Sequence, residues 1–86
     1  MKQKLLSRKN AIYTSRSSNT TVMINYDDKK EILEIEFTGG HIYHYLKVEP
    51  QVWEEYRMLI KNGGSSGKFI NTRIKPFYKY KEIENQ

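Results

Sequence analysis

The chain has 86 residues, a formal net charge of +5 and no cysteine. This length suits a single domain, and the lack of thiols excludes both a disulfide framework and a thiolate metal site. Seven tyrosines, three phenylalanines and one tryptophan predict a core built largely from aromatic rings, whose polar groups need partners or water.

The cations are spread unevenly along the chain. Residues 1–16 carry five cations and no acid, residues 17–66 carry a net charge of −3, and residues 67–86 carry a net charge of +3. Two basic ends that meet in space form one positive face, which attracts a polyanion at low salt. Basic ends that only keep a small protein soluble give the same distribution, so both interpretations stay open.

The first residues read as an arm and not as part of the domain. Residues 1–16 have no clean apolar period, so they form either a mobile arm or a short helix that docks late; we assign 1–17 as a basic N-terminal arm and 18–86 as a single domain. The pair Leu5-Leu6 is too short for a signal peptide, and no apolar run approaches the roughly 20 residues of a membrane span. We therefore expect a cytoplasmic protein without a membrane partner.

Three strands are predicted next, as an antiparallel meander. Residues 20–27, 32–37 and 41–46 alternate in polarity and are rich in β-branched and aromatic residues. Gly39-Gly40 marks the second hairpin, because glycine accepts the positive φ of a tight turn. A two-residue loop pairs Ile35 with His44. A three-residue loop is favoured, because it gathers more apolar area on one face: Leu33, Ile35, Phe37, Tyr43 and Tyr45.

Two helices follow the meander. Pro50 suits the first turn of a helix, where its missing N–H costs nothing. The apolar stripe of this helix falls at i, i+4, i+7 and i+8: Val52, Tyr56, Leu59 and Ile60. A shorter helix is predicted from about residue 67 to 74, capped by Ser65 or Ser66 and stopped by Pro76.

Residues 77–81 alternate again and predict a C-terminal edge strand. In this strand Tyr78 and Tyr80 turn toward the core, while Lys79 and Lys81 turn to water. The fold class is therefore α+β: a small antiparallel β-meander, three strands plus the edge strand, packed by one main and one short helix.

The order of these motifs resembles the KTSC domain, a small bacterial and phage module named after the C-terminus of some lysyl-tRNA synthetases. The resemblance covers residues 18–83 and rests on Asn25-Tyr26-Asp27, the 33–37 strand, Gly39-Gly40, Tyr43-His44-Tyr45 and the 66–71 segment. The helix segment between Val52 and Gly67 is longer than the family pattern, and the basic arm lies outside it. The resemblance implies a short meander with helices, and suggests RNA binding without a defined activity.

The C-terminal segment combines cations with aromatic rings, the pattern that holds a phosphate backbone while bases stack. The candidate stacking residues are Tyr43 and Tyr45, which would otherwise fill the core. The candidate phosphate contacts are Lys68, Arg73, Lys75, Lys79, Lys81 and Arg16.

Other chemistries find little support in the sequence. His41 and His44 fall on opposite strand faces and have no third ligand, so we expect surface histidines and no metal or cofactor. Glu34 and Glu36 share one strand face, which we read as solvated and not as a glycosidase pair. The segment 63–68 lacks the spacing of a phosphate loop.

We therefore expect a binding module and not an enzyme. Its expected partner is RNA or single-stranded nucleic acid, bound through the basic C-terminal face. The alternative is a protein-interaction module, such as a phage-borne inhibitor or an adaptor of a host protein, with an acidic partner. A retained partner after nuclease treatment distinguishes the second from the first.

Overall fold

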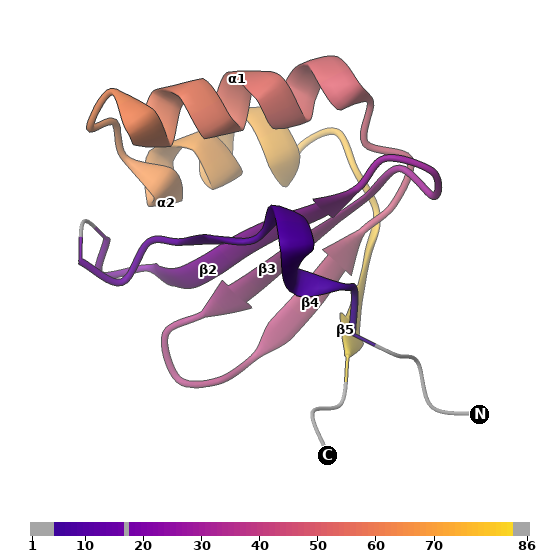
Figure 1. Cartoon of the computed structure of the whole chain (residues 1–86), viewed down its shortest axis with the longest axis horizontal. Helices are drawn as coiled ribbons and strands as arrows, with labels where there is room; N and C mark the ends of the chain where they lie inside the picture. The colour runs from indigo at the N-terminus through magenta and orange to yellow at the C-terminus, as the bar shows by residue number, and fades with distance from the viewer. Residues whose placement is uncertain (1–4, 17, 84–86) are drawn as a thin grey trace.

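The computed structural model describes residues 5–16 and 18–83. Within these residues five antiparallel strands form one sheet in the order β1-β2-β3-β4-β5, and helices cover one of its faces (Figure 1). The strands are β1 (Ile12–Tyr13), β2 (Thr21–Asp27), β3 (Ile32–Phe37), β4 (Ile42–Tyr45) and β5 (Tyr80–Ile83). The α+β prediction is confirmed, with five strands instead of four.

The register of the β3–β4 hairpin follows the favoured prediction. Leu33 pairs with Tyr45 and Ile35 with Tyr43, and the Phe37 N–H donates to the His41 carbonyl at 2.8 Å. Gly39 and Gly40 adopt φ values of +101° and +94°, which side chains disfavour and glycine accepts. The three-residue loop thus turns the apolar side chains of both strands toward the helices.

The helices match the sequence pattern. Helix α1 spans Pro50–Lys61, and α2 (Ser66–Phe69) continues into a turn of π-helix, η2 (Ile70–Ile74). The Ser65 side chain accepts from the Lys68 N–H, which is the predicted cap. Across α1 and β2 the rings of Trp53 and Tyr26 stack at 5.5 Å, so the core is aromatic as the composition predicts.

Two strand predictions need correction. Strand β5 begins at Tyr80, three residues later than the alternation over 77–81 indicates, because residues 77–79 form part of the connection between η2 and the strand. Strand β1 was not predicted; it lies in the segment that the sequence analysis treats as an arm and pairs with β2. Its two residues are too few to show a period.

The N-terminal segment covers the sheet face that the helices leave open. The 3₁₀ turn η1 (Arg8–Asn10) precedes β1, and Leu6 is buried. Its N–H donates to Glu34 Oε2 at 3.0 Å. Because Glu34 alternates with Leu33 and Ile35 of the helix face, this contact lies on the opposite face. Both faces of the central strands are therefore covered.

Candidate functional site

A groove of about 620 Å³ lies where β4, β5 and the segment after η2 meet. Its lining residues are Tyr43, Tyr45, Lys75, Tyr78, Lys79 and Tyr80. Two candidate cations and both candidate stacking tyrosines thus come together, with two further tyrosines from the C-terminal segment. Four rings and two ammonium groups on one concave surface are an arrangement suited to a planar anionic ligand.

Three of the groove's rings, those of Tyr43, Tyr45 and Tyr80, are in mutual contact. The ring centroids of Tyr43 and Tyr80 lie 4.8 Å apart, with 16° between the ring planes, and those of Tyr45 and Tyr80 lie 5.6 Å apart. Cross-strand pairing explains these contacts, because Tyr45 and Tyr80 are register partners on β4 and β5. Tyr80 remains 56% exposed, so one side of this cluster faces solvent.

The exposure of Tyr80 corrects the expectation that it turns into the core. It lies on β5, the edge strand, and it is absent from the apolar cluster under the helices. Tyr78 does pack against that cluster, and its hydroxyl donates to Glu49 at 2.5 Å. Burial, followed by this hydrogen bond, raises the pKa of Tyr78 to about 12. Tyr45 is buried and Tyr43 half-buried, and both line the groove as well as contributing to the apolar cluster.

Lys75 and Lys79 are exposed, and within the described residues neither forms an ion pair with a carboxylate. Their ammonium groups are therefore available to a bound anion. Flexible lysine side chains at the edge of an aromatic surface are suited to contact phosphates that flank a stacked base.

The other candidate cations lie elsewhere. Lys68 and Arg73 border a separate hollow of about 480 Å³ beside Glu55. There Arg73 Nη2 and Nε donate to the two Glu55 carboxylate oxygens at 2.7 and 3.2 Å. The Glu55 hydrogen bonds, together with its charge, raise the pKa of Arg73 above its usual value. This arginine is thus already paired.

Lys81 and Arg16 are also apart from the groove. Lys81 pairs with His44 across β4 and β5, so it points to the face opposite Tyr80, and the expected common face of Lys79 and Lys81 does not form. Arg16 lies in the connection between β1 and β2, beside the sheet edge opposite β5. The structure brings together two of the six predicted cations.

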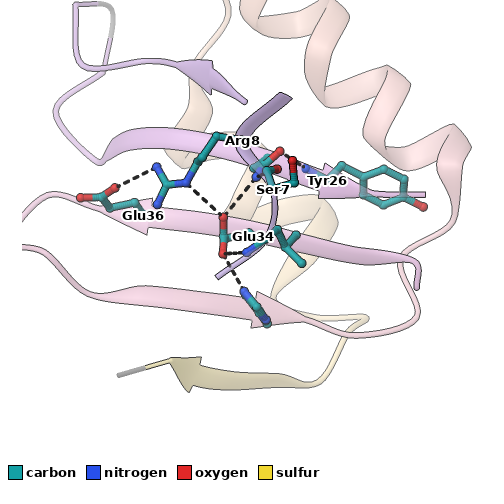
Figure 2. A network of polar contacts seen from close by, with 8 residues as sticks. Ser7, Arg8, Tyr26, Glu34 and Glu36 are labelled. Atoms are coloured by element: carbon teal, nitrogen blue, oxygen red, sulfur yellow. Dashed lines mark hydrogen bonds and ion pairs between the residues drawn. The ribbon is translucent and has the colours of Figure 1, made fainter. Parts of the chain in front are cut away.

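A second polar cluster lies on the sheet face away from the helices (Figure 2). Glu34 is fully buried and its carboxylate accepts from His44 Nε2 at 2.7 Å and Asn25 Nδ2 at 3.2 Å, in addition to Leu6. The guanidinium of Arg8 lies 3.8 Å from it. The expectations of a solvated Glu34 and a surface His44 were both wrong, because the N-terminal segment covers this face.

The electrostatics of this cluster favour a charged Glu34. Burial by itself raises the pKa of a carboxyl group. The hydrogen bonds from His44, the Leu6 N–H and Asn25 outweigh it, so the pKa of Glu34 lies below its ordinary value of 4.5. Within residues 5–16 and 18–83 every side-chain polar atom that is sealed from solvent has a hydrogen-bond partner, and this cluster links β2, β3 and β4 to the N-terminal segment. The sequence contains no signal for this buried cluster, because a strand alternates in polarity in the same way whether its polar side faces solvent or is covered by another segment.

No cluster of three or more potential metal ligands occurs in the described part of the chain. His41 contacts Glu82 at 2.7 Å, while His44 contacts Glu34. Helices long and apolar enough to cross a bilayer are likewise not found over residues 5–16 and 18–83.

A five-stranded antiparallel sheet, one helical layer and an open tyrosine-lined groove define a small α+β domain. The family model of the KTSC domain matches residues 17–80, so the chain belongs to the KTSC domain family. A crystal structure of a KTSC domain protein from Yersinia pestis is similar, with a TM-score of 0.62 and 29% identity, covering 78% of this chain and 89% of that one.

Two relatives show how the domain occurs. A lysine–tRNA ligase of Nostoc punctiforme is 36% identical over 59 residues, which is 69% of this chain and 10% of the ligase. A protein of Tsukamurella paurometabola is 35% identical over 54 residues, 63% of this chain and 75% of that protein. The chain therefore corresponds to a small part of the ligase and to most of the second relative.

Proposed function

We propose that this KTSC domain is a binding module for single-stranded nucleic acid, RNA in particular, and that it acts through the tyrosine-lined groove. The observation that carries the proposal is the stacked pair of Tyr43 and Tyr80 with Lys75 and Lys79 on the same concave surface. A base stacks on the exposed side of Tyr80, and the two ammonium groups contact the neighbouring phosphates.

The composition and one relative support this proposal. The chain carries a net charge of +5, which favours association with a polyanion. A matching relative is a lysine–tRNA ligase, an enzyme whose name identifies an RNA substrate. Since this match covers 10% of the ligase, only the RNA class, and no ligase activity, is carried to this chain.

The test is fluorescence anisotropy with labelled single-stranded RNA and DNA decamers at low salt. We expect saturable binding that the double variant Lys75→Glu/Lys79→Glu abolishes. The matched control is Lys29→Glu/Lys30→Glu, which makes the same change in net charge at two exposed lysines of the β2–β3 turn. Equal losses in both variants, or no binding of any probe, contradict the proposal.

Capture of partners from a cell lysate distinguishes our proposal from the protein-interaction alternative. Under our proposal, nuclease treatment releases what the wild-type domain retains. Retention of an acidic protein after nuclease, lost in Lys75→Glu/Lys79→Glu, supports the alternative instead.

A further inference from the structure

Buried tyrosine hydroxyls in this domain are paired inside the protein, with one exception. The Tyr26 hydroxyl donates to the Val48 carbonyl at 2.6 Å, and the Tyr56 hydroxyl lies 2.5 Å from Ser66 Oγ. Tyr45 is 1% exposed, yet within residues 5–16 and 18–83 no group hydrogen-bonds to its hydroxyl. A hydroxyl in such a place ordinarily finds a partner.

The Tyr45 hydroxyl borders the groove. Every side-chain polar atom of the described residues that is sealed from solvent has a hydrogen-bond partner. Because the Tyr45 hydroxyl has none, its small accessible area belongs to open space, and the open space that Tyr45 lines is the groove. A polar group that opens onto such a groove without a protein partner is a setting in which a ligand atom replaces water.

The state of this hydroxyl suits hydrogen bonding. Burial, and then the neighbouring Tyr43 and Tyr80, raise the pKa of Tyr45 to about 12. At neutral pH the group therefore keeps its proton and both donates and accepts. Its ring is buried in the core cluster that also contains Val52 and Tyr56, so the hydroxyl is fixed in position before a ligand arrives.

We infer that Tyr45 is the specificity-determining residue of the groove: its hydroxyl hydrogen-bonds to the polar edge of one nucleobase that stacks on Tyr80. This inference rests on the proposed function and adds a base-reading subsite to it. Lys75 and Lys79 contact phosphates, which every nucleotide carries, and the ring of Tyr80 accepts any base. The Tyr45 hydroxyl supplies a hydrogen-bonding group of the groove that distinguishes base edges.

The experiment compares wild type with Tyr45→Phe on RNA decamers of uridine, cytidine and adenosine, by anisotropy at one low salt concentration. We expect wild type to prefer one base by about 3- to 10-fold, the range of one or two hydrogen bonds. Tyr45→Phe retains the ring, and we expect it to reduce the preference to about twofold or less while it keeps the affinity for the least favoured decamer.

The matched control is Tyr26→Phe, which removes a hydroxyl already bonded within the protein and leaves the base preference unchanged. A measurement on the wild type makes the test independent of the folding of any variant. With ring-labelled tyrosine, the carbon bearing the Tyr45 hydroxyl shifts in the NMR spectrum when the preferred decamer is added, whereas that of Tyr26 does not.

Failures of the two proposals are distinguishable. If wild type binds no decamer, the proposed function and the subsite are both overturned. If wild type binds all decamers equally, or Tyr45→Phe keeps the full preference, or the Tyr45 resonance does not shift, the subsite is overturned and nucleic-acid binding stands.

Discussion

Glu34 on β3 and His44 on β4 face each other across the sheet, with 2.7 Å between Oε2 and Nε2 and both side chains buried. Since the ionised carboxylate only accepts, His44 Nε2 carries the proton of this bond. The same carboxylate accepts a hydrogen bond from the Leu6 N–H. One side chain thus joins two central strands to the N-terminal segment, and its loss leaves several buried donors without an acceptor.

Replacement of Glu34 tests this role. We expect Glu34→Ala to lower the free energy of unfolding by about 3 kcal/mol or more, because removal of one partner from a buried pair leaves the others uncompensated. Urea denaturation followed by tryptophan fluorescence measures the change. Glu36→Ala, which removes a half-buried carboxylate 4.0 Å from Arg8, should cost less than about 1 kcal/mol. Equal effects of the two substitutions contradict the assigned role.

The pH dependence of stability follows from the lowered pKa of Glu34. The folded pKa lies below the ordinary value of 4.5, so the stabilising contribution is present above the unfolded pKa and is lost as pH falls through the folded pKa. We expect the difference in unfolding free energy between wild type and Glu34→Gln to be largest near neutral pH and to shrink below pH 4.5. Urea titrations at a series of pH values measure it, and a difference that stays constant into acid is inconsistent with this pairing.

A hydroxyl chain ties α2 to the sheet. Ser66 Oγ lies 2.5 Å from the Tyr56 hydroxyl and accepts from Thr21 Oγ1 at 2.9 Å, and all three residues are buried. We expect Ser66→Ala to cost about 1–3 kcal/mol, the range for stranding buried hydrogen-bonding groups. Thermal and urea unfolding measure this cost, with the exposed Ser15→Ala as the control. If Ser66→Ala changes the free energy of unfolding as little as the control does, these hydrogen-bonded hydroxyls contribute no stability.

A comparison of two exposed aromatic residues distinguishes base stacking in the groove from general hydrophobic attraction. Tyr80 and Phe77 are 56% and 65% exposed, but only Tyr80 lines the groove. We expect Tyr80→Ala to weaken binding of single-stranded RNA by about 1–3 kcal/mol, the contribution of one stacked base. Phe77→Ala should leave the dissociation constant within about twofold. Anisotropy titrations decide, and the reverse order of effects places the binding surface outside the groove.

The salt dependence of RNA affinity measures how many phosphates the protein contacts. If Lys75 and Lys79 each neutralise one phosphate, substitution of either by Gln reduces the slope of log affinity against log salt by about 0.7. Lys81→Gln is the matched control, because Lys81 faces the opposite side of the sheet. Titrations between 50 and 200 mM salt measure the slopes. Equal slopes for all three variants contradict the assigned phosphate contacts.

Much of the fold was predictable because local patterns decide it. The β3–β4 register follows from the burial of alternating residues, and the start of α1 from Pro50. The groove was predictable in part. Tyr43, Tyr45, Lys75 and Lys79 were candidates, but the sequence grouped them with Lys81 and Arg73, which the fold sends to another face and into a pair with Glu55.

The sequence by itself determined which side chains share a strand face or a helix stripe, because backbone geometry fixes those periods. What covers each face was decided only by tertiary structure. The approach of Leu6 and Arg8 turned Glu34 and His44 from expected surface residues into a buried cluster. The start of β5 at Tyr80 likewise placed an exposed ring against Tyr43. Both outcomes depend on contacts between segments far apart in the chain, which no local period encodes.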